Sequence, residues 1–425
     1  MSDAPTTTTP TPGGGPAAPL TEPSDSRGSR LLREITTGNA AISVLAVVLA
    51  LVVSGLLIGF TDPTVQSTLG YFFSRPTDFL QAFGRSVGGS YSSLFQGAVY
   101  NFRVDGFAAG IRPLTETLNY SVPLIAAGLG VALAFRVGLF NIGARGQMLV
   151  AAGAAGWVGF SFDLPLAVHL PLALLAGIAG GAVWGGLVGL LKARTGAHEV
   201  ILTIMLNYIA FYLISFALRT PGLLQAPGSP NPKSPATLPS AVLPDMFGAR
   251  YNLNWGFVLV IVVTAVVWWL INRSTLGFRF RAVGENPHAA RTAGMDVKNI
   301  YLYAMLISGA LAGVAGSTQV LGTLTTGFTS GIDAGIGFDA ITVALLGRSR
   351  PWGVFGAGVL FGALKAGGYS MQAANGVPID IVLVVQSLIV LFVAAPPLVR
   401  SIFRLPAPGA RRAPSASMKE AVVTK

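Results

Sequence analysis

Long apolar runs, separated by shorter polar stretches, recur along the chain. A helix needs roughly 20 apolar residues to cross the hydrocarbon core of a bilayer, and the first run, from Ala40 to Phe60, meets this length. Further apolar segments follow near residues 118–135, 147–162, 171–191, 199–218, 255–272, 300–321, 338–347, 351–370 and 378–395. The pattern predicts an all-α, polytopic membrane protein with about ten transmembrane helices, some of them short or broken.

The positively charged residues distinguish the two sides of the membrane. When the amino terminus is placed inside, most Lys and Arg residues fall in short stretches on the inner side, which is the bias expected of cytoplasmic loops. These stretches include Arg136, Arg145, Lys192, Arg194, Arg348, Arg350 and the cations of residues 273–298. We therefore expect both termini to be cytoplasmic, and two long regions, residues 61–116 and 219–254, to be external loops.

The ends of the chain differ in composition from its middle. The sequence begins with a Thr-, Pro-, Gly- and Ser-rich stretch that lacks hydrophobic periodicity, which is typical of disorder. No small-residue cleavage site follows the first apolar run, so we expect an anchor and not a cleaved signal. The predicted organisation is a disordered cytoplasmic tail over residues 1–35, a transmembrane domain over 36–400 and a basic cytoplasmic tail over 401–425.

Composition and charge exclude several classes of protein. The 425 residues are 52% hydrophobic and only 11% charged, which leaves too little polar surface for a soluble globule. The net charge of +11 does not indicate nucleic-acid binding, because the cations lie beside apolar runs and not in a stripe interleaved with aromatic residues. The lack of cysteine and the scattered positions of the three histidines argue against disulfides, thiolate chemistry and a metal site.

Residues 273–298 form a basic stretch, punctuated by Gly and Pro, between two apolar runs. Gly284 and Pro287 interrupt the chain, whereas residues 288–293 are rich in Ala and favour a short helix that Gly294 would close. A compact helix outside the bilayer is suited to docking to a partner protein. An ordinary charged linker between two spans would share this pattern.

Two places interrupt the plain spans. Residues 135–148 contain Gly, Asn, Arg and Gln between two apolar runs, and residues 323–353 join a Gly-, Thr- and Ser-rich stretch to a short apolar segment with Asp339 near its start. Broken backbone at membrane depth is tolerated only inside protein or along a cavity. Such segments in both halves of a chain point to a translocation pathway. The alternatives are a cytoplasmic turn for the first and a short span for the second.

Three motifs resemble a known family. Residues 138–147 read Gly-Leu-Phe-Asn-Ile-Gly-Ala-Arg-Gly-Gln, residues 198–208 read His-Glu-Val-Ile-Leu-Thr-Ile-Met-Leu-Asn-Tyr, and residues 284–294 follow Gly-Glu-Asn-Pro-x-Ala-Ala-x-x-Ala-Gly. Over roughly residues 115–395 the chain resembles permease subunits of ATP-binding-cassette (ABC) importers for branched-chain amino acids, ribose and nucleosides. The second motif is most similar to the nucleoside and simple-sugar subgroup. This family usually has Glu at the position of Arg145, which puts in doubt any role that needs an acid there.

The resemblance implies a permease subunit in the plasma membrane and not an enzyme. A second permease subunit, identical or paralogous, would complete the pathway, cytoplasmic ABC ATPases would drive it, and an external lipoprotein would deliver the substrate. The chain has no Gly-x-x-x-x-Gly-Lys-Ser/Thr loop to cradle phosphates, so we expect no cofactor in it, and ATP and Mg would be bound by the partner ATPase. The residues implied to couple to that ATPase are Gly284, Glu285, Asn286, Pro287, Ala289, Ala290, Ala293 and Gly294.

The expected substrate is a nucleoside, because the motif at 198–208 and the long amino-terminal extension resemble nucleoside-type permeases. Ribose-like sugars and branched-chain amino acids are the alternatives. Amide and carboxylate groups can hydrogen-bond the hydroxyls and ring nitrogens of a nucleoside. The residues predicted to line the pathway are Asn141, Gly143, Gln147, Asn207, Phe338 and Asp339. Asn and Gln also tie helices together in membranes, and this alternative stays open for each amide.

A secondary transporter driven by protons or sodium is the competing class, and it would need an acidic or His relay inside the membrane. The candidate acids Glu116, Glu199, Asp339 and Asp380 all lie near predicted span ends, so the pattern favours the importer. Lys365 is unusual, because it is a lone cation within a Gly-rich span that either snorkels to the interface or faces the pathway.

Overall fold

The computed structural model describes residues 39–248 and 250–404. Within these ranges the chain is helical, and no strand occurs there beyond an isolated bridge between Asp245 and Asn254. The all-α prediction is therefore confirmed. The predicted amino-terminal tail, and nearly all of the predicted carboxyl-terminal tail, lie outside the described residues.

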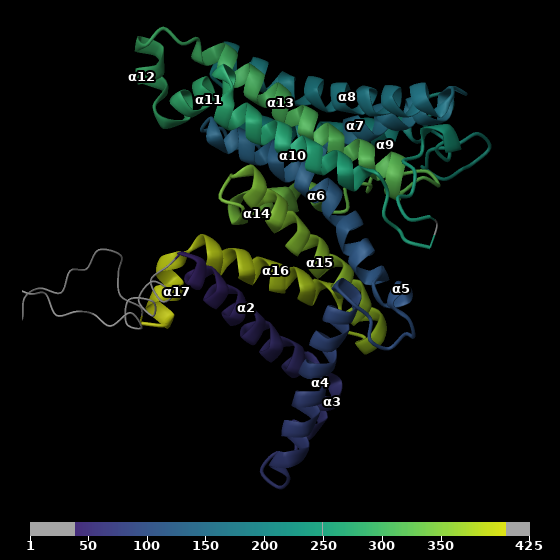
Figure 1. Cartoon of the computed structure of the whole chain (residues 1–425), viewed down its shortest axis with the longest axis vertical. Helices are drawn as coiled ribbons and strands as arrows, with labels where there is room; N and C mark the ends of the chain where they lie inside the picture. The colour runs from purple at the N-terminus through teal and green to yellow at the C-terminus, as the bar shows by residue number, and fades with distance from the viewer. Residues whose placement is uncertain (1–38, 249, 405–425) are drawn as a thin grey trace, which may run out of the picture. The chain divides into compact units, whose positions relative to one another are not determined.

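The helices follow one another along the chain (Figure 1). Their bounds are α2 (Asn39–Thr61), α3 (Pro63–Leu69), α4 (Pro76–Ala98), α5 (Phe107–Gly110), α6 (Arg112–Arg136), α7 (Ala144–Ser161), α8 (Leu166–Thr195), α9 (Glu199–Ala217), α10 (Gly256–Arg273), α11 (Thr275–Glu285), α12 (Pro287–Thr292), α13 (Val297–Thr318), α14 (Ile336–Leu346), α15 (Pro351–Asn375), α16 (Ile379–Ala394) and α17 (Pro396–Ile402). A short 3-10 turn, η1 (Pro239–Ala241), and a π-turn, η2 (Gln319–Thr323), lie between them.

The chain divides into two compact units. One comprises residues 46–396, and the other comprises residues 1–45 together with 397–425. Of the second unit the structure describes only the beginning of α2 and a carboxyl-terminal piece that includes most of α17. All the sites described below belong to the first unit.

Five helical segments of the described chain are long and apolar enough to cross a membrane, and the bent pair of α2 and α3, with an angle of 73° between them, makes a sixth if it counts as one span. The five segments are residues 107–136, 166–195, 199–217, 256–273 and 297–323. A polytopic membrane protein is therefore confirmed. The total of about ten spans stays a prediction, because α7 and α15 contain many small and polar residues, and α14 has only 11 residues.

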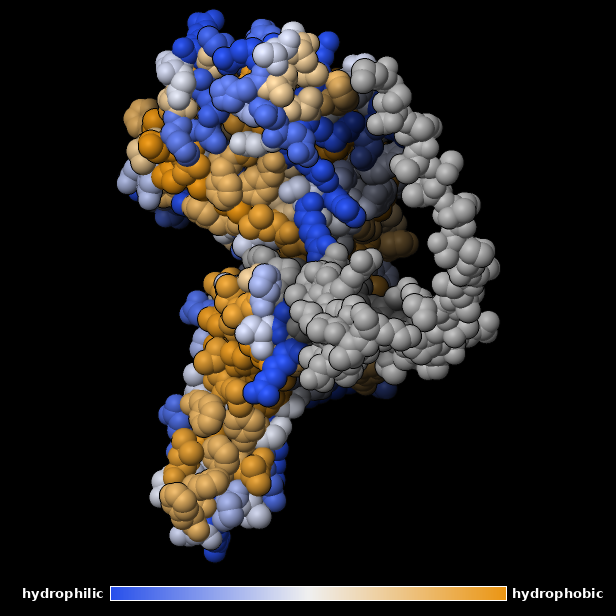
Figure 2. Space-filling view, turned by 90° about the vertical axis from the view of Figure 1, so that its left-hand side faces the viewer, coloured by the Kyte–Doolittle hydropathy of each residue, from blue (hydrophilic) through white to orange (hydrophobic). Residues whose placement is uncertain are grey.

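Helix α6 forms the centre of the first unit. Every residue from Ser121 to Ala134 is buried, because α10, α13, α14 and α15 all pack around this helix. By contrast, α9 and α10 leave large apolar side chains exposed, among them Tyr212, Val262 and Trp269. Figure 2 shows broad hydrophobic areas of this kind beside polar ones. Exposed apolar surface of this extent suits contact with lipid.

Helices α8 and α13 pack against each other through glycine. Gly177, Gly181 and Gly185 recur every fourth residue on α8 and are buried, so they lie on one face of the helix. A Cβ atom at Gly181 would clash with the backbone of Gly309 and Gly313 on α13, and one at Gly309 would clash with the backbone at Gly181. Small residues let the backbones of two membrane helices approach closely, and at Gly181 and Gly309 there is no space even for a Cβ atom.

We expect Gly181→Ala or Gly309→Ala to destabilise the protein by about 1–3 kcal/mol, which is the usual cost of overpacking, since the added methyl group meets backbone and not a flexible side chain. The measurement is the midpoint of thermal unfolding of the purified protein in detergent. Gly356→Ala on α15 is the matched control, because no atom lies within 4 Å of a Cβ placed there. Equal midpoints for Gly181→Ala and Gly356→Ala would contradict the close approach.

Candidate functional site

The first predicted break lies between α6 and α7. After Arg136 the chain turns at Gly138, which has a left-handed φ of 77°, and runs without helical structure until Ala144. A left-handed turn at this point favours glycine, which has no Cβ atom to clash. Because the backbone N–H and C=O groups of this break have no helical partners, side chains from neighbouring helices must bond them.

Asn141 bonds the first break to two helices. Its side chain is fully buried, and its Nδ2 atom donates to Ser308 Oγ on α13 at 2.8 Å and to Gln147 Oε1 on α7 at 3.2 Å. Its Oδ1 atom accepts from the Gly143 backbone N–H at 2.8 Å. Ser308 Oγ in turn donates to the carbonyl of Gly130 on α6 at 2.7 Å. A buried polar network that is satisfied in this way holds one arrangement of the helices.

Asn207 on α9 completes the support of the first break. Its Oδ1 atom accepts from the backbone N–H of Gly146 at 2.8 Å, and its Nδ2 atom donates to the carbonyl of Ile142 at 3.0 Å. The first bond satisfies one of the N–H groups that the first turn of α7 leaves free. Three of the predicted residues are amides that bond one part of the fold to another, as helix-tying amides do. They are Asn141, Gln147 and Asn207. Their contact with substrate stays a prediction.

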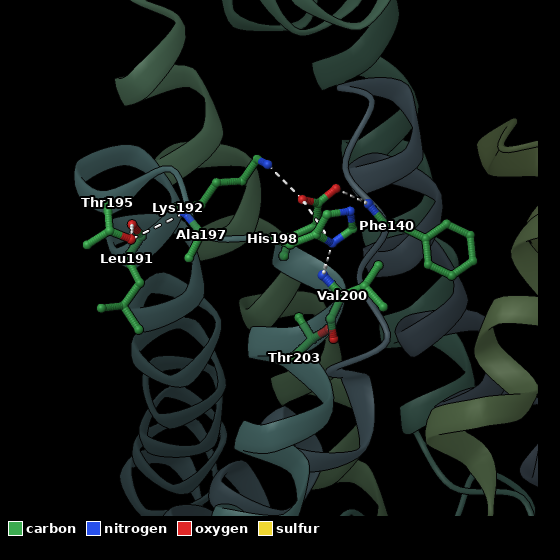
Figure 3. Close-up of polar contacts among 9 residues, drawn as sticks. Phe140, Leu191, Lys192, Thr195, Ala197, His198, Val200 and Thr203 are labelled. Carbon is green, nitrogen blue, oxygen red and sulfur yellow. Dashed lines mark hydrogen bonds and ion pairs between the residues drawn. The ribbon is translucent and has the colours of Figure 1, made fainter.

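Glu199 links the end of α8 and the start of α9 to the same break (Figure 3). Its carboxylate accepts from Lys192 Nζ at 2.6 Å and from the backbone N–H of Phe140 at 3.5 Å. His198 precedes it as the cap of α9, with Nδ1 accepting from the Val200 backbone N–H at 3.3 Å. Glu199 therefore has a structural partner at the end of α8.

The second predicted break lies between α13 and α14. Helix α13 ends in the π-turn η2, and a loop then leads to α14, a helix of 11 residues whose cap Gly335 has a left-handed φ of 80°. A Cβ atom at Gly337, in the first turn of α14, would clash with the backbone of Arg145, in the first turn of α7. The amino-terminal ends of the two helices therefore touch, and the two breaks form one site.

An ion pair joins the two breaks. Arg145 Nε lies 3.3 Å from Asp333 Oδ2, and the Arg145 guanidinium also lies over the ring of Phe211, 5.4 Å from its centroid. The Asp333 side chain is 4% exposed and the Arg145 side chain 30%. In the sequence, Arg145 is a departure from the family motif, and Asp333 was not among the predicted site residues. A cation in an apolar setting needs a counter-charge, so the presence of Arg145 could have indicated that a nearby acid such as Asp333 belongs to the site.

A second charged group lies beside this ion pair. Lys365 on α15 donates from Nζ to the carbonyl of Ala334 at 3.1 Å and interacts electrostatically with Asp339 and Asp333. Asp339 lies in the first turn of α14 and is partly buried, whereas Phe338 is 49% exposed. The structure thus brings the predicted residue Asp339 next to Lys365, whose position in a span was otherwise unexplained.

Residues 273–298, the basic stretch that is predicted to couple to the ATPase and that we call the coupling loop, contain two helices. The predicted helix at 288–293 is observed as α12, with Asn286 as its cap, since Asn286 Oδ1 accepts from the backbone N–H groups of His288 and Ala289 at 3.0 Å. Helix α11 precedes it and was not predicted. Glu285 and His288 are exposed, and Ala290 is buried. The loop therefore offers a polar surface outside the packed helices.

Gly284 connects the coupling loop to the first break. A Cβ atom at Gly284 would clash with the backbone carbonyl of Arg136, the last residue of α6. Arg136 Nε donates to the carbonyl of Ser349, between α14 and α15, at 3.0 Å. The coupling loop, the end of α6 and the start of α15 are therefore in direct contact.

The chain is similar in sequence to known transport proteins. Residues 114–394 match the family described as the permease component of branched-chain amino acid transport systems. The guanosine ABC transporter permease protein NupP of Bacillus subtilis is 42% identical over 73% of this chain and 87% of its own length. The glucose ABC transporter permease protein TsgB13 of Haloferax volcanii is 36% identical over 66% of this chain and 75% of its own length. The nucleoside ABC transporter permease protein NupB of Lactococcus lactis is 34% identical over 74% of this chain and 85% of its own length. No solved structure matches the chain.

We expect Arg145→Ala to destabilise the protein more than Asp333→Ala. Removal of Arg145 leaves a nearly fully buried carboxylate without its counter-charge, whereas removal of Asp333 leaves a partly exposed guanidinium that can reach water. The loss for Arg145→Ala should be about 1–3 kcal/mol, measured by thermal unfolding in detergent.

The double variant Arg145→Ala with Asp333→Ala tests the same ion pair. We expect it to be more stable than Arg145→Ala alone, because no buried charge is left without a partner. Strict additivity of the two single effects would contradict the coupling between the breaks.

Proposed function

Since the chain belongs to the family of branched-chain amino acid transport system permease components, we propose that it is the permease subunit of an ABC importer for nucleosides. The observation that carries this proposal is the identity of 42%, over most of both chains, to a guanosine permease protein. The capped helix α12, outside the packed helices, supports it, because a permease needs such an element to contact its ATPase. The chain itself is not an enzyme.

The topology we propose has about ten membrane-crossing segments within residues 36–400, with both termini in the cytoplasm and the plasma membrane as the location. Helices α7, α14, α15 and α16 add to the clearly apolar spans, and the packing of neighbours around α7 and α15 supports their inclusion. Residues 61–116 and 219–254 are the external regions. Residues 273–298 form the coupling loop on the cytoplasmic side. Residues 1–35 and 401–425 are cytoplasmic tails.

The partners we propose are a second permease subunit, identical or paralogous, a cytoplasmic ABC ATPase and an external substrate-binding lipoprotein. ATP and Mg are bound and hydrolysed in the ATPase, and this chain holds no cofactor of its own. The residues that we propose to couple to the ATPase are Gly284, Glu285, Asn286, Pro287, Ala289, Ala290, Ala293 and Gly294. Among them, Glu285 and Asn286 are exposed and can touch the ATPase, whereas Gly284 faces Arg136. When the ATPase moves α12, the contact of Gly284 with Arg136 carries the displacement to the first break and to the start of α15.

A sugar importer is the second candidate function. A specific observation favours it, because a glucose permease protein is 36% identical to the chain. Branched-chain amino acids are a third possibility, through the description of the family alone. An ion-coupled secondary carrier has no comparable support.

We expect cells that contain this chain to take up radiolabelled guanosine, adenosine and uridine, and cells from which it has been deleted to lose most of this uptake. Depletion of ATP should abolish the difference, whereas collapse of the proton gradient at constant ATP should leave it. Labelled glucose and leucine serve as competing substrates in the same assay. Uptake of glucose in place of nucleosides would support the sugar importer. Loss of uptake when only the proton gradient is collapsed would overturn the ABC assignment.

We expect Gly284→Ala to lower uptake at least tenfold while the chain still associates with its ATPase. The added methyl group forces the coupling loop away from the Arg136 carbonyl, so movement of α12 no longer reaches the spans. Uptake and co-purification of the ATPase are measured on the same membranes. Gly88→Ala on α4 is the matched control, because no atom lies within 4 Å of a Cβ placed there. Normal uptake by Gly284→Ala would contradict this route of coupling.

A further inference from the structure

Helix α15 is unsuited to face lipid along its whole length. Its 25 residues are enough to cross a bilayer at about 1.5 Å per residue, yet it is not among the described helices that are apolar enough to do so. It carries Lys365 and Tyr369, which are four residues apart and therefore share one face. An ionisable residue at such a depth faces protein or a water-filled cavity, because exposure to hydrocarbon is costly.

A continuous series of polar and aromatic side chains extends from this face. We call it the polar stripe, and its members are Glu116 and Tyr120 on α6, Tyr369 and Lys365 on α15, and Asp339 on α14. These three helices are neighbours in the fold (Figure 1). The rings of Tyr120 and Tyr369 lie 5.8 Å apart with an angle of 40° between their planes. Lys365 then donates from Nζ to the carbonyl of Ala334 at 3.1 Å, in the second break, which leads into the first turn of α14 with Asp339.

The other end of the polar stripe reaches a predicted external region. Glu116 lies one helical turn from Tyr120 and interacts with it electrostatically, and its carboxylate accepts from Asn252 Nδ2 at 3.2 Å. The stripe therefore connects the predicted external side of the protein with the place where the two breaks meet.

The polar stripe is only partly covered by the rest of the chain. Tyr369 is 44% exposed and Phe338, beside Asp339, is 49% exposed. In contrast, Asn141, Gln147 and Asn207 are buried and bonded to other parts of the protein. The stripe thus leaves the ring of Tyr369 partly open to a ligand, and among the described residues Lys365 makes a single hydrogen bond, to the carbonyl of Ala334, whereas each of these amides is buried and bonded.

We propose that the polar stripe is the surface that a nucleoside contacts during translocation. The base lies against Tyr120 and Tyr369, because an aromatic ring stacks on any base. Lys365 and Asp339 bond the hydroxyl groups of the sugar, as charged donors and acceptors in an apolar cleft commonly do. This inference rests on the proposed function and adds to it the residues that meet the substrate.

The chain contains no cysteine, which makes single-cysteine labelling a direct test. Tyr369→Cys and Tyr120→Cys are compared with Tyr212→Cys on α9, a tyrosine that is 67% exposed on an apolar helix. Each variant is incorporated into the whole importer in membrane vesicles and exposed to a water-soluble, charged methanethiosulfonate reagent. Such a reagent needs a thiolate in contact with water. The extent of labelling is measured from the mass of this chain.

We expect Tyr369→Cys and Tyr120→Cys to be labelled at least tenfold faster than Tyr212→Cys. Guanosine, added with ATP and the external binding protein, should slow the labelling at least threefold, and leucine should not. Labelling as slow as that of Tyr212→Cys would mean that lipid or the second subunit covers the stripe, and it would overturn the inference. Fast labelling without protection by guanosine would overturn it as well.

Two further measurements keep the test independent of folding and of the proposed function. Lys365→Cys serves as a second reporter if a tyrosine variant does not assemble with the ATPase. Tyr369→Phe should retain guanosine uptake, and Tyr369→Ala should lower it at least fivefold, whereas Tyr212→Ala should not. Guanosine uptake by the unaltered chain is measured in the same vesicles. Uptake without protection of the cysteines overturns only the inference about the stripe, whereas no guanosine uptake overturns the proposed function.

Discussion

A backbone N–H or C=O group inside a bilayer has no water to bond, so every interruption of a helix at membrane depth has to be satisfied by the protein itself. In this chain that constraint decides the position of α6. The break that follows α6 is held by Asn141, through Ser308 on α13, and by Asn207 on α9. The break therefore needs both α13 and α9 beside it, and α6, which leads into the break, is buried among its neighbours.

The same constraint explains why the two breaks lie together. A helix amino terminus presents unpaired N–H groups, and the ends of α7 and α14 meet at Gly337. Charges gather there in compensating pairs, with Asp333 facing Arg145 and Asp339 near Lys365. Arg136 lies against Gly284 of the predicted coupling loop and donates to the Ser349 carbonyl, so only a few residues connect this loop with the start of α15. Such contiguity is what a rigid-body movement needs in order to act at a distance.

Much of the fold could be predicted from the sequence, because apolar runs and helix caps are local signals. A short helix was expected at residues 288–293 and is observed at 287–292, because Pro287 favours a helix start and Gly294 a helix end. Helix α11 was missed, because its arginines made it look like a loop. The ion pair of Arg145 with Asp333, and the contact of Tyr120 with Tyr369, join residues far apart in the chain. Hydropathy gives no information on such pairings, and they decide the candidate site.

Whether a polar side chain is available to a substrate depends on its partners in the fold and not on its residue type. Amides were the natural candidates in the sequence, because they are polar groups in apolar runs. In the structure, Asn141, Gln147 and Asn207 already hold the first break, so recruiting any of them for a substrate would leave a buried polar group unbonded, at a cost of about 1–3 kcal/mol. A partly exposed side chain that holds no helix in place can bond a substrate without this loss of free energy. Tyr369 has its ring partly exposed, and an aromatic face discriminates a flat base from a branched aliphatic side chain. The proposed substrate contacts are therefore side chains that the packing of the helices leaves partly exposed, and not the amides that hold the first break.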